Sequence, residues 1–207
     1  SYRMDPSVPL VIPEVNPDHL ALITRQRRER GWSGAIVTNP NCSTVVLSIV
    51  LAPLRQFGLS RVMVTTLQAV SGAGYPGVPS LDILGNVIPT ISGEEEKMES
   101  ETQKILGRLE RDAVSPHSVT ISAQTTRVPV VDGHTEAISI GFDTPPSHAD
   151  VRAALADFAG RPQELLLPSA PPNPIICVSA PDRPQPRLDV ARDSGMTISV
   201  GRVRPCP

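Results

Sequence analysis

The chain has 207 residues, of which 40% are hydrophobic and 19% are charged, and this length suffices for one large domain or two small ones. Its 19 basic and 21 acidic residues give a formal net charge of -2, which favours neither nucleic acid nor an acidic membrane as a partner. No apolar run reaches the roughly 20 residues of a membrane span, so we expect a soluble, cytoplasmic protein. The 3 cysteines include no C-x-x-C pair, which indicates reduced thiols and predicts neither disulfides nor a metal site.

The first forty residues predict a strand, a helix and a second strand. Residues 8–15 form an apolar run typical of a buried strand. Asn16 and Pro17 suit a helix N-cap and first turn, so we expect a helix over residues 19–30 and a short strand over residues 34–38. The helix ends in a basic cluster, for which a solvated face favoured by the helix dipole is a simpler interpretation than a phosphate site: Arg25, Arg27, Arg28 and Arg30.

The middle of the chain predicts a buried helix and a strand. Residues 45–57 are apolar nearly all round, which favours a buried helix with a kink at Pro53. Residues 61–70 have the composition of a strand, and a glycine-rich loop comes next over residues 71–77. Ser92 then stands three residues before Glu95, a capping-box spacing that predicts a helix over residues 94–109.

Alternating strands dominate the second half of the chain. Residues 119–131 and 136–142 alternate as strands do, and the turn between them is typical of an antiparallel connection. A helix over residues 151–158, capped by Ser147 and Asp150, and two strands at 175–179 and 197–203 complete the prediction. The order lacks the regular strand-helix alternation of a doubly wound fold. We therefore expect an α+β fold with a mixed, largely antiparallel sheet flanked by helices.

Cys42 is the first candidate for chemistry. A proline turn delivers it to the N-terminus of a buried helix, where unpaired N–H groups and the helix dipole would favour a thiolate and could hold an oxyanion. A lone cysteine is as often an inert packing residue, and its position leaves both interpretations open. Cys177 lies in a strand and is expected in the core, whereas Cys206 lies close to the chain end.

His134 is the best of four histidines as a partner for such a thiol, because it lies in a turn after a strand. Arg127 could grip a substrate carboxylate or be an ordinary strand arginine, and Glu94 with Lys97 could be a surface ion pair one helical turn apart. The remaining histidines are expected at the surface: His19, His117 and His148.

A glycine pattern, G-x-G-x-x-G, starts at Gly72. We reject it as a dinucleotide fingerprint because Pro76 interrupts it and the next residues of the chain are not helical. The exposed backbone of this loop can still contact a ligand.

Four motifs in order carry a resemblance that covers nearly the whole chain: NPNCST at 39–44, QAVSGAG at 68–74, GEEEKM at 93–98 and RVPVVDGHT at 127–135. Together they resemble aspartate-semialdehyde dehydrogenase, in the form found in its archaeal and fungal branch. The resemblance implies a catalytic domain built like that of glyceraldehyde-3-phosphate dehydrogenase. It further implies that residues 1–38 are a stub of the N-terminal dinucleotide-binding domain with its connecting helix, and that residues 39–207 form the catalytic and dimerisation domain. The rest of the dinucleotide-binding domain and the family's C-terminal helix are not in this sequence.

The resemblance also implies a role for each matching residue. Cys42 matches the nucleophile that forms a thioester, His134 the acid/base group, and Gln68 the glutamine that orients the acyl intermediate. Arg127 matches the ligand of the substrate carboxylate, and Glu94 the partner of its amino group. Lys97 matches a contact to the phosphate and Asn41 a contact to the substrate. Ser71 and Gly72 match the loop beside the nicotinamide.

The implied reaction is the NADP-dependent reductive dephosphorylation of aspartyl phosphate to aspartate semialdehyde, which serves lysine, methionine and threonine synthesis. The implied partners are the acyl-phosphate substrate, phosphate and a second copy of the chain, with a tetramer possible for the intact enzyme. Because most of the NADP site lies outside the sequence, we expect this piece to be inactive by itself. The alternatives are a related acyl-phosphate reductase such as N-acetylglutamyl-phosphate reductase, a non-catalytic dimerisation module, or a thiol hydrolase.

Overall fold

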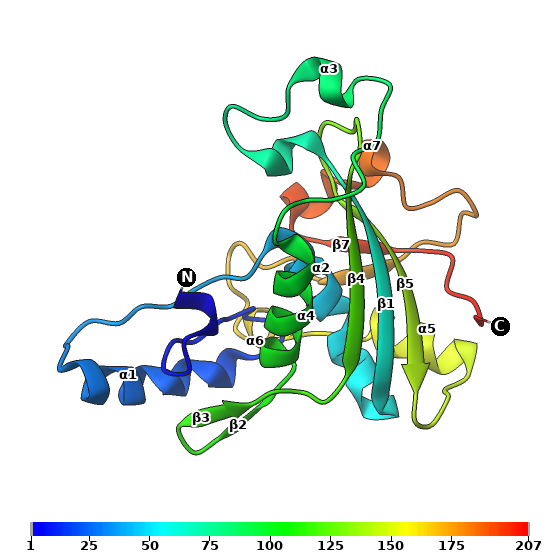
Figure 1. The fold of residues 1–207 in the computed structure, drawn as a ribbon. Coiled ribbons are helices and arrows are strands. Elements are labelled where there is room, and N and C mark those ends of the chain that lie inside the picture. The colour runs from blue at the N-terminus through cyan, green and yellow to red at the C-terminus, as the bar shows by residue number, and fades with distance from the viewer. Residues whose placement is uncertain (1, 207) are drawn as a thin grey trace.

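The computed structural model describes residues 2–206 and is built around a three-stranded sheet with the order β4-β1-β5. The central strand β1 (Leu59–Gln68) pairs in parallel with β4 (Thr120–Arg127) and antiparallel with β5 (Thr135–Phe142). Figure 1 shows the three strands side by side. Buried and exposed residues alternate along β1 from Val62 onward, so one face of the sheet packs on the core and the other faces outward.

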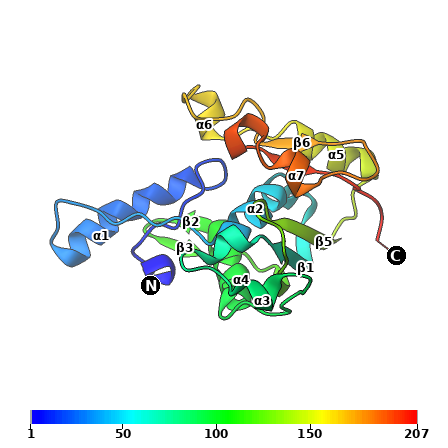
Figure 2. The ribbon, with the colours of Figure 1, turned by 90° about the horizontal axis from the view of Figure 1, so that it is seen from above.

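Two helices reach the inner side of the sheet. The helix α2 (Cys42–Leu51) continues into the 3-10 helix η3 (Ala52–Phe57), because a proline near the start of the second segment cannot donate the next helical hydrogen bond. The helix α4 (Glu94–Ile105) packs against both α2 and β4. From above, α2 lies between the sheet and a further group of helices and strands (Figure 2). One core joins these layers, including Leu47, Leu51, Val62, Met98 and Ile105.

The remaining elements are short. The α-helices are α1 (Leu22–Arg30), α3 (Ser80–Ile83), α5 (His148–Ala156), α6 (Arg161–Glu164) and α7 (Pro186–Asp189). The strands form two small sheets, β2 (Arg108–Glu110) with β3 (Ala113–Ser115), antiparallel, and β6 (Ile175–Cys177) with β7 (Ile198–Val200), parallel. The other 3-10 helices are η1 (Tyr2–Met4), η2 (Pro17–Ala21), η4 (Val70–Ala73) and η5 (Arg192–Gly195).

The prediction that residues 119–131 and 136–142 form an antiparallel hairpin is wrong. β4 and β5 do not pair with each other, because each lies on a different side of β1. The chain after β4 crosses the end of β1 instead, where Val128 N–H donates to the Gln68 carbonyl at 3.0 Å and Val70 N–H to the Val130 carbonyl at 2.8 Å. The mixed α+β architecture is confirmed, with parallel pairing in β1-β4 and β6-β7 beside the antiparallel pairs.

The two strands predicted near the N-terminus are also wrong, but the predicted burial of the first segment is confirmed. A single isolated β-bridge, between Leu10 and Thr38, joins residues 8–15 to residues 34–38, and neither segment forms a strand. Val8 and Leu10 are fully buried. Asn16 does not cap the following helix, since its side chain accepts from Ile12 N–H at 2.9 Å and donates to the Leu10 carbonyl. The expected helix is present as η2 followed by α1.

Of the two capping boxes predicted from the sequence, the structure contains one. The capping box at Ser147 and Asp150 is confirmed at the start of α5. The one expected at Ser92 is wrong: the N-cap of α4 is Gly93, whose φ of 67° lies in the left-handed region, and no side chain caps this end.

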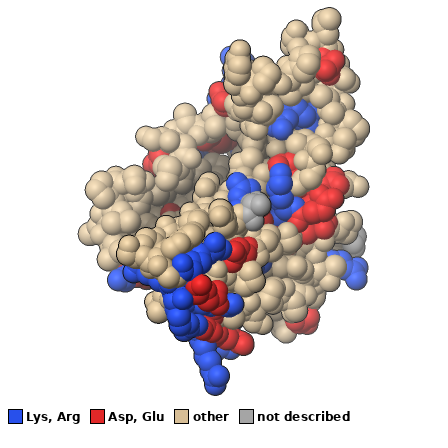
Figure 3. Space-filling view, turned by 60° about the vertical axis from the view of Figure 1, so that its left-hand side comes forward, with Lys and Arg blue, Asp and Glu red and all other residues tan. Residues whose placement is uncertain are grey.

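The helix α1 projects sideways from the body of the molecule in both ribbon views (Figures 1 and 2). Its arginines gather with acidic residues among them on the face shown in Figure 3. The ion pairs are Arg25 with Glu29 at 2.7 Å, Arg28 with Asp112 at 2.7 Å, and Arg30 with Asp5 at 2.6 Å. Three of the four arginines are thus paired with carboxylates, and Arg27 donates to the Gly34 carbonyl at 3.2 Å, so these contacts favour a solvated face over a phosphate site.

The expected division at residue 38 remains a prediction. Leu10, Ile12 and Val15, which precede it, belong to the same core cluster as Leu47 and Val62, which lie beyond it. Among residues 2–206, no helix has the length and apolar character needed to cross a bilayer.

Candidate active site

The N-terminus of α2 presents Cys42 at the molecular surface. The turn before it ends at Asn41, whose Oδ1 accepts from Ser43 N–H at 3.0 Å and Thr44 N–H at 3.3 Å and so caps the helix. Asn41 is itself held from behind, because its backbone N–H donates to Glu101 Oε2 at 2.8 Å. Cys42 is the first helical residue and is exposed.

His134 meets this thiol from the loop that crosses the end of β1. Its Nε2 lies 3.2 Å from Cys42 Sγ, although 92 residues separate them in the chain. On the other side of the ring, Nδ1 accepts from the backbone N–H of Ala69 at 3.0 Å. The predicted thiol-imidazole pair is therefore present.

Although Cys42 lies at the surface, the groups packed around the pair shield it from part of the solvent, which favours the uncharged thiol and the neutral imidazole. This partial burial lowers the pKa of His134, with Arg127 adding to this effect and Glu94 opposing it. It raises the pKa of Cys42, an effect that the Ser43 N–H opposes and the charge of Glu94 reinforces. The helix N–H groups therefore lower the pKa of Cys42 as expected, while desolvation and Glu94 raise it, and the thiolate stays a prediction.

Arg127 and Gln68 lie opposite each other in the parallel ladder, at the ends of β4 and β1. Arg127 is 6% exposed, and its Nη1 donates to the Ala69 carbonyl at 2.7 Å. The side chain of Gln68 is buried and donates to Thr66 Oγ1 at 3.3 Å. The sheet therefore brings both predicted residues to the end of β1 where His134 lies.

Glu94 connects the first turn of α4 to the first turn of α2. One carboxylate oxygen accepts from the Asn41 side-chain amide, and the other pairs with Lys97 Nζ at 3.1 Å. Its charge also influences the pKa of both Cys42 and His134. Glu94, Lys97 and Asn41 thus form one connected group beside the reactive pair.

The turn η4 covers the other side of the pair. A Cβ on Gly72 would lie 2.8 Å from His134 Cε1 and 3.0 Å from Arg127 Nη1, so only glycine lets the backbone approach this closely. Ser71 is exposed, and its N–H donates to the Val131 carbonyl at 3.2 Å. The glycine pattern starts in this 3-10 turn and not at a long helix, which agrees with its rejection as a dinucleotide fingerprint.

Two contributors escaped the sequence-based prediction. The Ala69 backbone bonds both His134 and Arg127, and no side-chain pattern could reveal it. Glu101, which is 2% exposed, holds the Asn41 N–H; its position two helical turns after Glu94 places it on the same face of α4 and would have pointed to it.

The other cysteines and histidines lie away from the reactive pair's contacts. Cys177 packs partly buried against the core as expected, and Cys206 is exposed. The expectation of a surface position is wrong for His19, which is 1% exposed and lies 2.9 Å from the Asn16 side-chain nitrogen. His148 is exposed, and His117 is half-buried.

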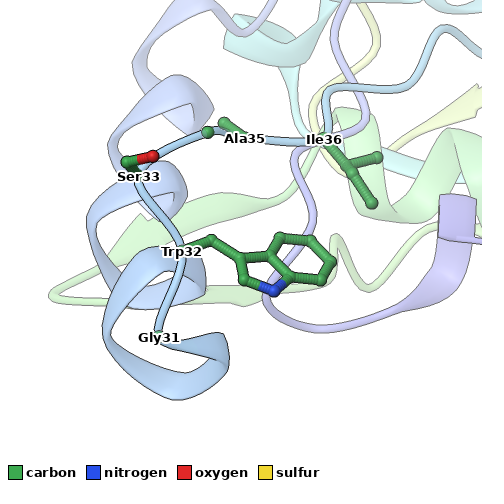
Figure 4. A pocket seen from close by; sticks show the side chains of 6 residues that line it. Gly31, Trp32, Ser33, Ala35 and Ile36 are labelled. Carbon is green, nitrogen blue, oxygen red and sulfur yellow. The ribbon is translucent and has the colours of Figure 1, made fainter.

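A separate hollow of about 490 Å³ lies beside the loop after α1 (Figure 4). It is lined by residues 31–36, among them Trp32, and none of these side chains titrates. It therefore offers no titratable acid or base. Among residues 2–206, no three His, Cys, Asp or Glu side chains gather as a metal site would require.

Residues 51–207 match the family model described as the semialdehyde dehydrogenase dimerisation domain. The chain belongs to the semialdehyde dehydrogenase family. It is 55% identical over 205 residues to the aspartate-semialdehyde dehydrogenase of Methanothermobacter thermautotrophicus, which covers 99% of this chain and 59% of that relative. The aspartate-semialdehyde dehydrogenase of Cryptococcus neoformans is 52% identical over 217 residues, or 100% of this chain and 60% of that relative.

A solved structure of this semialdehyde dehydrogenase family supports the same assignment. The aspartate semialdehyde dehydrogenase of Candida albicans, determined with NADP, superposes with a TM-score of 0.90 at 43% identity, covering 100% of this chain and 60% of that one. The resemblance to archaeal and fungal members is therefore confirmed, as is the fold. The chain spans less than two thirds of the length of these relatives.

Proposed function

We propose that this chain is the catalytic and dimerisation part of an NADP-dependent aspartate-semialdehyde dehydrogenase. The observation that supports it most is the 3.2 Å approach of His134 Nε2 to an exposed Cys42 at a capped helix N-terminus. Such a thiol has room for an acyl group and N–H donors nearby for the oxygen that becomes negative. The similarity to dehydrogenases that act on this aldehyde adds the substrate class.

In the proposed reaction, Cys42 Sγ attacks the acyl carbon of aspartyl phosphate as its proton is lost to solvent. The carbon-oxygen bond to phosphate then breaks, phosphate leaves with both bonding electrons, and a thioester remains on the sulfur. When bound, NADPH would supply a hydride to the thioester carbon; the carbon–sulfur bond then breaks, the aldehyde is released, and the sulfur of Cys42 leaves as the thiolate. His134 lies where its ring can form a hydrogen bond with the sulfur or with the oxygen that becomes negative.

Each charged group of the proposed substrate has a side chain of opposite charge near the Cys42 sulfur. Arg127 is proposed to bind the substrate carboxylate, since its guanidinium can form paired hydrogen bonds with it. Glu94 is proposed to bind the ammonium group, and this requires Lys97, whose side chain is 46% exposed, to leave Glu94 and turn to the phosphate. Asn41 positions Glu94, and Gln68 is proposed to orient the acyl group.

The cofactor contact proposed for Ser71 and Gly72 agrees with the packing of η4. The absence of a Cβ at Gly72 lets this turn lie directly on His134, so a nicotinamide held by its exposed backbone would face the reactive pair. These residues fit only the nicotinamide end of the cofactor. We therefore propose that the chain alone binds NADP weakly and turns over no substrate, and an affinity equal to that of the full-length protein would contradict this.

The outward face of the sheet is proposed to form a homodimer. Met63 is 58% exposed and Leu67 is 42% exposed on the central strand, and the family model matched here is described as a dimerisation domain. Apolar side chains at alternate positions of a strand form a flat surface that a second copy can cover.

The test of this function compares thiols and substrates. Iodoacetamide at neutral pH should label Cys42 faster than Cys177 or Cys206, because the His134 ring 3.2 Å from the sulfur would stabilise the thiolate against the burial that raises its pKa. Equal labelling of all three would contradict a reactive thiol. The full-length protein should reduce aspartyl phosphate in preference to N-acetylglutamyl phosphate, because Glu94 offers a charge to a free ammonium group that the acetylated substrate lacks. Phosphate release without NADPH consumption would instead favour a thiol hydrolase.

A further inference from the structure

The backbone of Ala69 contacts two side chains of the proposed site at once. Its N–H donates to His134 Nδ1 at 3.0 Å, and its carbonyl accepts from Arg127 Nη1 at 2.7 Å. Ala69 itself is fully buried. A backbone N–H cannot change from donor to acceptor, so this contact places a condition on the protonation of the ring.

A neutral imidazole carries one N–H, and its other nitrogen can only accept. Since Nδ1 accepts from Ala69, the ring proton is on Nε2, the atom 3.2 Å from Cys42 Sγ. If Nε2 took a second proton from the thiol, the first would have to leave it. If the ring became an imidazolium, an N–H on Nδ1 would point at the N–H of Ala69.

We propose that the Ala69 N–H fixes His134 in the tautomer protonated at Nε2, so that the ring acts on Cys42 as a hydrogen-bond donor and not as the base that removes the thiol proton. This inference rests on the proposed role of Cys42 and His134 as the reacting pair. The thiol then loses its proton to water, and the Nε2–H group stabilises the thiolate that remains. In this assignment Ala69 is a positioning residue.

The groups packed around the ring agree with a neutral donor. Arg127 faces it from β4 and disfavours a second positive charge, and burial acts in the same direction, so the pKa of His134 is lowered. Glu94 on α4 opposes this but already accepts hydrogen bonds from Asn41 and Lys97. Gly72 lies against the ring, since a Cβ added there would lie 2.9 Å from Nε2.

The first test replaces the ring with a side chain that donates without acting as a base. In H134Q an amide N–H2 can occupy the position of Nε2–H, whereas H134A has neither donor nor base. We expect the apparent pKa of Cys42 alkylation by iodoacetamide to rise by about 1–2 in H134A, and to stay within about 0.5 of the parent value in H134Q. If H134Q behaves as H134A does, the ring is a base and the proposal is wrong.

The second test observes the protonation of the ring nitrogens directly. Nitrogen NMR of the full chain, labelled with ¹⁵N-histidine, distinguishes a protonated from an unprotonated ring nitrogen, and the spectrum of H134Q assigns the His134 signals by their loss. We expect Nδ1 unprotonated and Nε2 protonated at pH 7.5. A ring protonated at Nδ1, or an imidazolium, would overturn the proposal.

Both measurements are independent of substrate and NADP. A full-length protein that turns over no aspartyl phosphate but shows the expected tautomer contradicts the proposed function alone. An active enzyme with an Nδ1–H ring contradicts this inference alone.

Discussion

Gly72 is the residue at which a single added carbon has the clearest consequence. A Cβ there would meet His134 Cε1 at 2.8 Å and Arg127 Nη1 at 3.0 Å, so one of the two side chains must move. We expect G72A to lower kcat/KM of the full-length protein by about 100-fold, the effect typical of a misplacement of about 1 Å.

The control for G72A is G34A, because Gly34 has no positive φ and a Cβ on it would meet nothing within 4 Å. G34A should keep the parent activity, and the unfolding midpoint in urea should show that G72A is folded. Parent-like kinetics in G72A would mean that η4 shifts without disturbing the pair.

His19 makes a prediction about the pH dependence of stability. Burial lowers its pKa, so as the pH falls through the ordinary value the unfolded chain takes up a proton more readily than the folded one. The free energy of unfolding therefore decreases from pH 7.5 to pH 5.5. H19Q should reduce this decrease, measured by urea unfolding at the two pH values. An equal decrease in H19Q and the parent would contradict the assignment.

The sequence predicted the residues of the site better than their electrostatics. Cys42, His134, Arg127 and Glu94 were found from motifs, because each motif keeps its residues together in the chain. The raised pKa of Cys42 could not be predicted, since it depends on burial and on the charge of Glu94, which arrives from a distant segment. The contact between Ala69 and His134 has no side-chain signal at all.

At the scale of elements, the first turn of α2 joins stability to reactivity through Asn41. N41A removes the acceptor of two helix N–H groups and should lower the free energy of unfolding by about 1 kcal/mol, measured with urea. N41D keeps the acceptor for these N–H groups but loses the amide that donates to Glu94 and places a second carboxylate beside it, so it should not recover that stability. It also adds a negative charge next to Cys42, so it should raise the pKa of the thiol and slow its alkylation at pH 7.5. Equal alkylation of N41D and the parent would exclude this effect.

Elements with a local signal were predicted correctly. The cap at Ser147, the stop at Gly31 and the alternation along β1 each depend on neighbouring residues. The pairing of strands does not. β4 and β5 are close together in the chain, yet β1 lies between them, and only the contacts across the sheet decide that order.

At the scale of the whole molecule, the proposed homodimer through the outward face of the sheet can be tested by substitution. M63D places a charge at the centre of the proposed dimer interface and should weaken dimerisation by at least about tenfold in sedimentation velocity. The matched control is L166D, because Leu166 is 87% exposed outside the sheet and its φ of 51° suits aspartate. A parent chain that is monomeric at high concentration would contradict the interface.

The central position of β1 also bears on how the protein is made. A ribosome releases β1 long before β4 and β5, its two neighbours in the finished sheet, so both edges of this strand wait unpaired during synthesis. Contacts between such distant segments form slowly. Chaperone demand during translation should therefore be concentrated in the interval between the emergence of Gln68 and that of Phe142.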